Sequence, residues 1–396
     1  MLILAIDLGK YNSMCCFFDT RIQQPEFMGI KTSRFSVNSL LDNRRPDLVV
    51  MEACGPSGWI GDLCHQRGIK TLVCSTNEEA WSWKNVKRKT DRDDALRLAK
   101  MTVLRDLKSV HLPKSEIREQ RTLIKYRKTL DRRITRIKNA IRSLFANRGI
   151  EIDSGKRAWC SGRERIDSHR KPLADCDVNE LWKGELDLEL TQLDDLTDKL
   201  KAVEERLERL AEGNQQVQRL MQIPGVGRKT AEALVAAIDD PHRFKSARQV
   251  SAYLGLVPRQ YQSGQTDRNG RISKRGPRLL RSLLLECAWC SVRYNLWAKE
   301  TYTRIHGGQS TRKKKAGIAL ARKIAVVAWA MMRDEADWNP KKLLPDVDPA
   351  EVKLRPQRSK AHPRGELHAE RPKRPLSGRR RGRPSQGARR RAPVSK

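Results

Sequence analysis

The stretch Leu2-Ile3-Leu4-Ala5-Ile6-Asp7-Leu8-Gly9-Lys10 opens the chain and decides the fold of its first third. Five apolar residues in a row predict a buried strand, and an acid stands where that strand ends. Further short apolar runs bounded by turn residues predict strands at 14–18, 27–32, 47–51 and 71–74. Residues 36–41 and 58–67, between these strands, can be helical. The order predicts a mixed α/β sheet, in which a meander is continued by parallel crossovers.

Four acids in this region could form one site. Asp7 and Glu52 each close a predicted strand, and the carboxyl ends of strands line the functional crevice of an open sheet. Asp91 and Asp94 are three positions apart in a predicted helix at 91–105, so their carboxylates share one face. Four neighbouring carboxylates repel one another unless cations neutralise them. Their oxygens select Mg²⁺ or Mn²⁺, and a pair of such ions can bind the attacking and leaving oxygens of a phosphoryl transfer.

Each acid taken singly has a plainer explanation. An aspartate at the end of a strand often caps the next helix, and two aspartates on a charged helix usually belong to a solvated face. The ordered set Asp, Glu, Asp-x-x-Asp on this strand order is more specific. It favours an RNase H-like catalytic domain in residues 1–110.

The chain is strongly basic. Its 81 Lys and Arg outnumber 47 Asp and Glu, which gives a formal net charge of +34. The last 44 residues hold 16 of these cations and two Glu, so the preceding body keeps a charge of about +20. A basic body points to a polyanionic partner. Nucleic acid is the commonest one, because each neutralised phosphate releases counterions.

The sequence predicts neither a membrane span nor a disulfide framework. We find no signal peptide before the first predicted strand, and Arg322 and Lys323 interrupt the most apolar later stretch, 317–332. The nine cysteines show no pairing pattern. Cys287-Ala288-Trp289-Cys290 has the spacing of a metal-ligand pair, but it lies in a leucine-rich helix, which favours core packing. We therefore expect a soluble, cytoplasmic protein.

Two long amphipathic helices are predicted within residues 111–215. Their apolar stripes run through 115–147 and 193–210, with Arg and Lys around the first stripe and Glu and Asp around the second. The two helices could pair as an antiparallel coiled coil, dimerise, or pack within one subunit, and the pattern does not choose among these. The polar, irregular stretch 150–187 between them predicts an insertion or a linker.

Residues 216–340 predict a mostly α-helical domain. Ile223-Pro224-Gly225-Val226-Gly227 precedes a helix at 228–238 and looks like the loop of a helix-hairpin-helix motif. Gly225 and Gly227 would let the backbone approach a phosphate, and Arg228 and Lys229 add positive charge. Such a loop positions a duplex without reading its sequence. A plain connection between two helices is the alternative.

A β-hairpin is predicted at 259–274, with Asn269-Gly270 as its turn. Ser263-Gly264 lies inside this hairpin, where a serine beside a glycine is ordinary. Several cations surround it, however, and could bind a scissile phosphate: Arg259, Arg268, Arg271, Lys274, Arg275 and Arg278. A serine hydroxyl attacks only when a base or a metal activates it, and no histidine lies nearby in the sequence.

Residues 341–396 are rich in Arg, Pro, Gly and Ser and have few hydrophobic residues, which predicts a disordered basic tail. Arg381-Gly382-Arg383-Pro384 matches the core of an AT-hook, whose Arg-Gly-Arg can lie in a narrow A·T minor groove. Nonspecific binding of a polyanion is the alternative.

The chain resembles the DEDD transposases of the insertion-sequence 110 family, which are related to Piv-type DNA invertases. The motifs that match its RuvC-like half are Asp7-Leu8-Gly9-Lys10, Val50-Met51-Glu52 and Lys89-Thr90-Asp91-Arg92-Asp93-Asp94-Ala95. Those that match its C-terminal half are Ile223-Pro224-Gly225-Val226-Gly227, Phe244-Lys245-Ser246, Tyr253-Leu254-Gly255-Leu256-Val257-Pro258, Ser263-Gly264 and Gly270-Arg271-Ile272-Ser273-Lys274-Arg275-Gly276. The resemblance extends over roughly residues 1–335 and leaves out the basic tail.

This resemblance implies that Asp7, Glu52, Asp91 and Asp94 hold Mg²⁺ and that Ser263 forms a transient phosphoserine linkage to DNA. It further implies a homodimer or homotetramer, in which the metal domain of one subunit meets the serine of another. Some members of the family use a structured noncoding guide RNA, and the basic helix at 115–147 would suit one.

Two other functions remain open from the residues alone. The first is a RuvC-like, metal-dependent endonuclease in which water attacks and Ser263 is structural. The second is an inert nucleic-acid binder left by a decayed element. The intact acids argue against the second.

Overall fold

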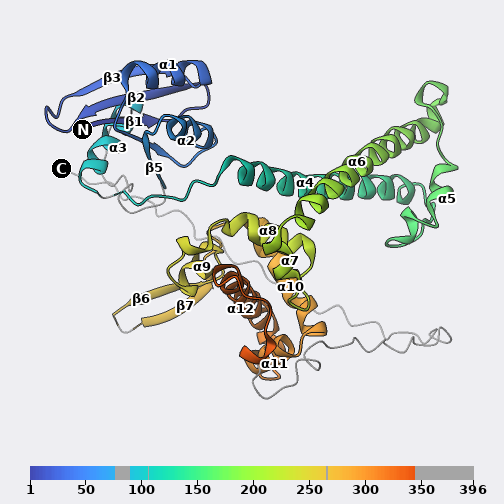
Figure 1. The fold of residues 1–396 in the computed structure, drawn as a ribbon. Helices are drawn as coiled ribbons and strands as arrows, with labels where there is room; N and C mark the ends of the chain where they lie inside the picture. Colours follow the sequence, from blue (N-terminus) through green and yellow to red (C-terminus); the bar gives the residue numbers. More distant parts are fainter. Residues whose placement is uncertain (76–89, 106, 265, 344–396) are drawn as a thin grey trace, which may run out of the picture. The chain divides into compact units, whose positions relative to one another are not determined.

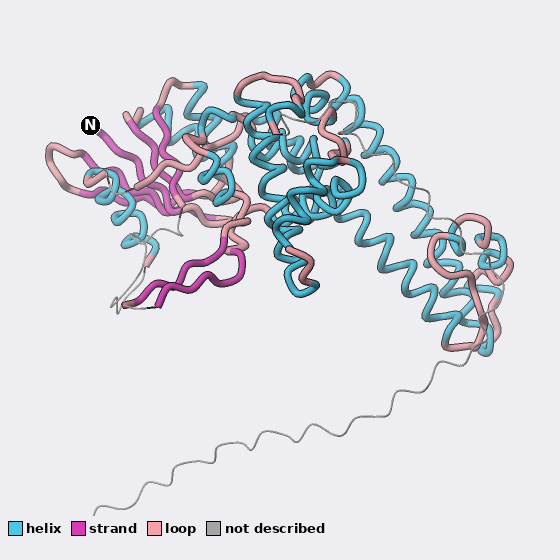
Figure 2. The backbone as a smooth tube through the Cα atoms, turned by 90° about the horizontal axis from the view of Figure 1, so that it is seen from below, coloured by secondary structure: helices cyan, strands magenta, loops and turns pink. Residues whose placement is uncertain are grey.

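The computed structural model describes residues 1–75, 90–105, 107–264 and 266–343 (Figures 1 and 2). The chain divides into two units, Met1–Arg355 and Pro356–Lys396, and the second lies outside the described residues. Of the predicted tail, residues 344–396, which include Arg381 and Arg383, lie outside the described residues. None of the described helices is long and apolar enough to cross a membrane.

The N-terminal region forms a five-stranded sheet of the predicted topology. Its strands are β1 (Leu2–Asp7), β2 (Asn12–Asp19), β3 (Pro25–Lys31), β4 (Leu48–Glu52) and β5 (Lys70–Cys74), in the order β3-β2-β1-β4-β5. The first three strands form the antiparallel meander, and β4 and β5 run parallel to β1. This is the strand order expected of an RNase H-like sheet.

Helices cover both faces of this sheet, because successive side chains of a strand point to opposite faces. Leu4 and Ile6 of β1 pack in one core with α1 (Arg34–Arg44) and α2 (Ser57–Gln66). Ile3 and Ala5 pack in a second core with α3 (Asp91–Val103). The alternation of β1 therefore supplies two cores and leaves its terminal Asp7 at the carboxyl edge of the sheet.

The two long helices pack against each other within the chain. They are α4 (Ser115–Ala146) and α6 (Leu181–Glu212), and their stripes share one core that includes Ile134, Ile141 and Leu193 (Figure 1). The structure thus pairs the two helices within one chain. Leu210, expected in the apolar stripe, is exposed.

The segment between these helices is irregular, as expected, but it is packed. It contains α5 (Arg163–Asp167) and the 3₁₀ turns η2 (Arg157–Trp159), η3 (Leu173–Asp175) and η4 (Val178–Glu180), and residues 181–187 already belong to α6. Ala158 and Ile166 are fully buried in the core of the helix pair. Phe145 meets the rings of His169 and Trp182 edge-on, at centroid distances of 5.4 and 5.8 Å. The segment thus closes the end of the helix pair.

The C-terminal region is mostly helical around one core, as predicted. Its helices are α7 (Gln215–Met221), α8 (Arg228–Ile238), α9 (Ala247–Tyr253), α10 (Arg278–Tyr294), α11 (Leu296–His306) and α12 (Lys313–Arg333), with 3₁₀ turns η5 (Pro241–Arg243), η6 (Ser310–Arg312) and η7 (Pro340–Lys342). Helix α11 was not predicted from the sequence. Asn295 ends α10 and caps α11 with its side chain, so the two helices follow each other without a loop.

The hairpin is present, but its predicted turn is wrong. Its strands are β6 (Pro258–Ser263) and β7 (Thr266–Ile272), so the chain reverses next to Gly264, which has φ +53°. Asn269 and Gly270 instead lie inside β7, where the register shifts opposite the start of β6. A Cβ on Gly270 would come within 2.7 Å of the Tyr261 ring, so this glycine serves close packing across the strands.

Candidate active site

Two of the predicted acids lie at the carboxyl edge of the sheet, on neighbouring parallel strands. Ile6 of β1 pairs with Met51 of β4, so the next residues, Asp7 and Glu52, follow the same register. Both side chains are half-buried. The pKa of the Cys54 thiol is raised, first by burial and then by the negative charges of Glu52 and Asp7. Both carboxylates therefore act on the same point beyond the strand ends.

The other two acids lie in the first turn of α3, which packs against β1 and β2. Asp91 is exposed, whereas Asp94 is half-buried and its Oδ1 is shielded from solvent. Asp93 has a different task. The Thr90 hydroxyl accepts a hydrogen bond from the Asp93 backbone N–H at 3.2 Å and donates one to Asp93 Oδ2 at 2.6 Å. This is a helix N-cap, which explains an acidic residue at this position without catalysis.

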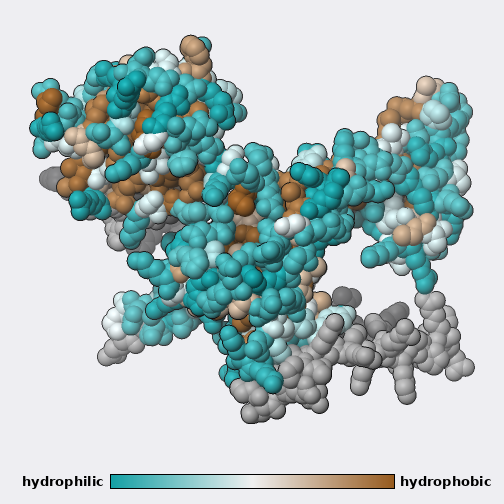
Figure 3. Space-filling view, in the orientation of Figure 1, coloured by the Kyte–Doolittle hydropathy of each residue, from teal (hydrophilic) through white to brown (hydrophobic). Residues whose placement is uncertain are grey.

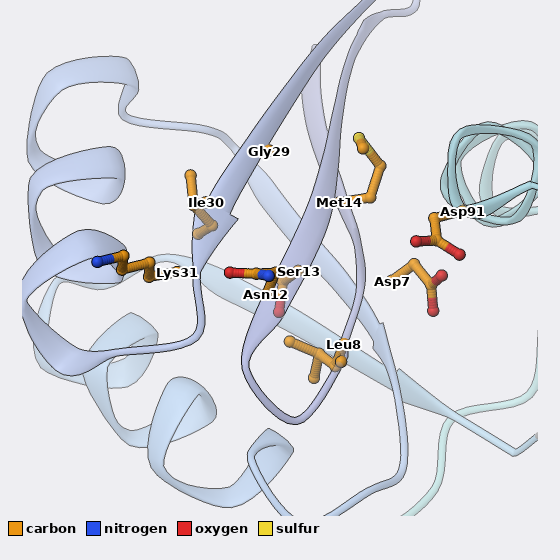
Figure 4. A pocket seen from close by; sticks show the side chains of 10 residues that line it. Asp7, Leu8, Asn12, Ser13, Met14, Gly29, Ile30, Lys31 and Asp91 are labelled. Atoms are coloured by element: carbon orange, nitrogen blue, oxygen red, sulfur yellow. The ribbon is translucent and has the colours of Figure 1, made fainter.

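Asp7 and Asp91 line one cavity of about 420 Å³, although 83 residues separate them in the chain. Their carboxylates point toward each other in Figure 4. Asn12 and Lys31, from β2 and β3, line the same cavity. The sequence alone does not single out these two residues, because one Asn or Lys at a strand end carries no signal by itself.

The loop that borders this cavity is held tightly. The Thr32 hydroxyl donates a hydrogen bond to Gly9 O at 3.0 Å, and the Thr32 backbone N–H donates one to Tyr11 O at 2.7 Å. A Cβ on Gly9 would come within 2.1 Å of Asn12 O, so only glycine fits there. The loop after Asp7 is therefore fixed before any ligand binds.

The donor atoms at this edge suit a divalent cation, because they are carboxylate oxygens from two strand ends and a facing helix. Asp7 and Asp91 meet at the cavity, and Glu52 follows the register of Asp7. Within the described ranges, no group of three or more His, Cys, Asp or Glu side chains is arranged as a complete metal site. The cavity thus has the right ligand chemistry, with two of the four acids converging on it.

Ser263 is the last residue of β6 and is exposed, as is Gly264 beside it. The hairpin around it is hydrophilic on the face seen in Figure 3. Arg259 and Arg268 of the two strands are exposed as well, and the Arg268 guanidinium lies 5.9 Å from the centre of the Tyr261 ring. The structure thus presents the serine hydroxyl to solvent, on a hairpin that also carries Arg259 and Arg268.

Three further cations, at the end of the hairpin and just after it, are exposed. Arg271, Lys274 and Arg275 form no ion pair with any acid in the part of the chain that the structure describes. Their charges are therefore available to an external anion.

The glycine-rich loop at 223–227, predicted to bind phosphate together with Arg228 and Lys229, packs against the C-terminal core. Gly225 has φ +98°, and a Cβ there would come within 2.4 Å of Ser291 Oγ, so it packs against α10. Gly227 is the N-cap of α8. Arg228 pairs with Glu208, and Lys229 pairs with Glu204. Both cations predicted to bind phosphate are thus neutralised by α6.

A buried ion pair also joins α4 to α8. Arg127 Nη1 lies 2.8 Å from Glu232 Oε2, and the two side chains are only 5% and 0% exposed. Arg228 reaches the same carboxylate at 3.5 Å. The signal that could have found Arg127 is its place in the apolar stripe, three residues after Ile124 and three before Leu130.

Cys287 and Cys290 of α10 differ in their surroundings. Cys287 is buried in the C-terminal core, where burial raises the pKa of its thiol to about 12, whereas Cys290 is exposed. Core packing, the favoured interpretation, is confirmed for Cys287.

Comparison with known proteins gives consistent matches. Residues 4–147 match a family model described as a transposase, and residues 217–303 match the model of the IS116/IS110/IS902 transposase family. A transposase of insertion sequence IS1111A from Coxiella burnetii is 29% identical over 338 residues, covering 83% of this chain and 89% of that protein. A transposase of IS1328 from Yersinia enterocolitica is 27% identical and covers 83% and 96%.

Two further similarities are more limited. The pilin gene-inverting protein of Moraxella bovis is 32% identical over 121 residues, which is 30% of this chain and 38% of that protein. Among solved structures, Thermus thermophilus RuvC in complex with a Holliday junction aligns with a TM-score of 0.21 and 14% identity, over 28% of this chain and 100% of that one. A TM-score of 0.21 supports no argument about the fold.

Proposed function

Because the chain belongs to the IS116/IS110/IS902 family of transposases, we propose that it cuts and rejoins DNA through a covalent serine intermediate, as the site-specific recombinase of a mobile element. The observation that carries this proposal is the cavity at the edge of the sheet, where Asp7 and Asp91 meet. Carboxylates gathered from a strand end and a facing helix suit phosphodiester chemistry.

Asp7, Glu52, Asp91 and Asp94 are the residues that would hold a divalent cation, Mg²⁺ or Mn²⁺. When bound, such an ion supplies positive charge that neutralises the scissile phosphate and activates an attacking oxygen. Lys31 lines the same cavity, with its side chain directed away from the two carboxylates (Figure 4). The fixed loop after Asp7 keeps the carboxylate of that residue in place, so little reorganisation is needed when DNA binds.

Ser263 is the proposed nucleophile. Its Oγ attacks the phosphorus and forms a phosphoserine bond, while the bond from phosphorus to one bridging sugar oxygen breaks. The departing oxygen takes up a proton and becomes a free hydroxyl end of the DNA. A hydroxyl end of another strand then attacks the phosphoserine, which restores Ser263 and joins the strands. The cations near the hairpin support this role, because they can bind the phosphate as its negative charge grows.

The serine still needs a group that accepts its proton, and no histidine is present in the hairpin or its flanks. We expect the carboxylate site to meet Ser263 in a homodimer or homotetramer, with the acids of one subunit acting on the serine of another. A mixture of Asp7→Asn and Ser263→Ala chains tests this arrangement. Each variant alone would be inactive, and the mixture would regain activity only if the site is shared between subunits.

A structured RNA guide is a further part of the proposal. Lys125, Arg132, Arg133 and Arg136 are exposed on α4 and form no ion pair within the described residues. An exposed row of cations on a long helix suits an RNA backbone. RNA of discrete length that copurifies with the wild type and is lost on substituting these four residues with Gln would support guidance.

The decisive experiment separates recombination from hydrolysis. Element-end DNA is incubated with protein and Mg²⁺, and a denaturing gel is used to detect a protein–DNA adduct. We expect the adduct with wild type and with Gln262→Ala, a substitution of an exposed neighbour. Ser263→Ala should form none, and Asp7→Asn should form none. Undiminished cutting by Ser263→Ala, without an adduct, would favour the metal-dependent endonuclease that uses water.

A further inference from the structure

A second cavity lies in the C-terminal domain, where the hairpin joins α10. It has a volume of about 470 Å³ and is lined by residues of the hairpin root, α10 and α12, and we call it the α10 pocket. Three cations line it: Lys274, Arg278 and Arg281. In the described part of the chain, none of the three pairs with an acid. The pocket therefore concentrates positive charge that the fold itself does not neutralise.

Hydrogen bonds to the backbone fix the Arg281 guanidinium and the main chain of Lys274. Arg281 Nη1 donates hydrogen bonds to Gly276 O at 2.8 Å and Leu254 O at 3.3 Å. Lys274 has φ +57°, and its backbone N–H bonds to Gly255 O at 3.2 Å. Burial, and then the neighbouring charge of Arg278, lower the pKa of Arg281. Like charges held this near to one another favour a bound anion.

The remaining walls of the pocket are apolar. They are formed by Leu256, Ile272, Leu285 and Ile318, with the small Ala321 on α12. Ser282 adds a hydroxyl on the exposed side of α10. A cluster that bound only the phosphates of a duplex would have no use for these walls. A pocket of this volume, lined by three cations and five apolar residues, fits a ligand with a phosphate and a flat apolar body.

We infer that the α10 pocket binds an unpaired nucleotide of DNA, with its phosphate on Lys274, Arg278 and Arg281 and its base against the apolar walls. A base within a duplex is stacked and cannot reach such a site. A base that has left the stack, at a strand end or at an opened junction, can enter it. This inference rests on the proposal that the chain acts on DNA, and it concerns binding, not the bond-breaking step.

The test uses the full chain and two DNA duplexes that differ in one feature. The first carries a single unpaired 2-aminopurine, and the second carries the same base fully paired. Binding is measured by anisotropy of a distant fluorophore, and entry of the base by the 2-aminopurine emission. We expect wild type to bind the unpaired form about tenfold more tightly, the range of one base contact, and to change its emission.

Two variants and one control locate the binding site. Ser282→Trp fills the pocket from its exposed rim and should abolish the preference, while binding of the paired duplex stays within about twofold of wild type. Arg278→Gln, at an exposed position, removes a phosphate contact and should lower the preference as well. Thr303→Trp places the same bulky side chain at an exposed position of α11 and should keep the preference. Thermal unfolding midpoints equal to that of wild type establish that the variants fold.

Each outcome decides the question. Tight binding of both duplexes without a preference, or a preference that survives in both Ser282→Trp and Arg278→Gln, overturns the α10 pocket while leaving the proposed function intact. A wild type that binds neither duplex overturns both. A wild-type preference lost in the two pocket variants, and kept in Thr303→Trp, supports the inference.

Discussion

Replacing Arg127 with methionine tests whether the buried pair between α4 and α8 stabilises the C-terminal core. Arg127 and Glu232 lie 2.8 Å apart, and Glu232 is fully buried. Methionine keeps most of the volume of the arginine stem but leaves the carboxylate without its nearest cation. Loss of one partner from a buried pair costs about 3–5 kcal/mol, because the remaining charge stays desolvated.

The structure places the expected cost at the lower end of that range. Arg228 remains 3.5 Å from the Glu232 carboxylate and can partly replace Arg127. We therefore expect Arg127→Met to destabilise α8 by about 3 kcal/mol, a factor of roughly a hundred in the opening equilibrium. The double variant Arg127→Met/Glu232→Met should recover most of this loss, because it removes both buried charges.

Hydrogen exchange measured by mass spectrometry gives a local readout, which suits a chain with several cores. Peptides that cover 228–238 should lose about a hundredfold protection in Arg127→Met, and peptides from β1 should be unchanged. The matched control is Lys199→Met, which breaks the exposed pair between Lys199 and Asp195, 2.6 Å apart, and should not alter exchange in α8. A change in α8 no larger than that of the control would refute the reasoning.

Four further predictions follow from the site and the surface. Asp7→Asn should abolish Mg²⁺-dependent strand cleavage, measured on a gel. Asp93→Asn should only destabilise the start of α3, because Asp93 takes part in the N-cap. Loss of cleavage in an Asp93→Asn protein that is still folded would contradict the different roles of these two acids. Lys274→Gln should weaken DNA binding and lower the slope of log K against log salt by about 0.9. Lys229→Gln should change the slope little, because the charge of Lys229 is already paired. Equal slopes in the two variants would refute this difference. Hydrogen bonds from Lys171 and Lys183 hold the pKa of Glu180 at about 2, so its contribution to stability is complete above the unfolded value of about 4.3 and is lost as the pH falls through 2. Glu180→Gln should therefore flatten the stability curve in that acid window, as acid titration followed by circular dichroism would detect. Deletion of 353–396 should weaken binding and reduce its salt dependence while cleavage of bound DNA persists, and loss of that cleavage would count against a purely electrostatic role.

The N-terminal fold could be predicted because its signals are local. Each strand is a short apolar run that ends at a turn residue, and burial on both faces follows from the alternation within β1. The position of Asp7 and Glu52 at one edge then follows from parallel pairing. The approach of Asp91 to Asp7 could be expected only from the four acids taken as a set, because it depends on how α3 packs against the sheet.

The predicted position of the hairpin turn was wrong because the local preference of Asn-Gly competed with packing between the two strands. Asn-Gly favours a two-residue turn wherever it occurs. Here the Tyr261 ring lies against Gly270, and the reversal takes place next to Gly264 instead. The register of two paired strands depends on packing between their side chains, and the turn preference of a dipeptide carries no information about that packing. The consequence for the site is direct, since Ser263 stands beside the reversal and not in mid-strand.

The sequence alone did not predict which cations are paired with acids in the folded chain. Arg228 and Lys229 follow a glycine-rich loop and were expected to bind phosphate, but their partners, Glu208 and Glu204, lie on a helix that ends before α7 begins. Lys274, Arg278 and Arg281 have no such partners within the described residues, although their local sequence is no more telling. The count of 81 Lys and Arg therefore overstates the number of cations that are open to DNA. We expect the cations left unpaired by the fold to bind DNA, and one group of them lies where the hairpin that carries Ser263 joins α10.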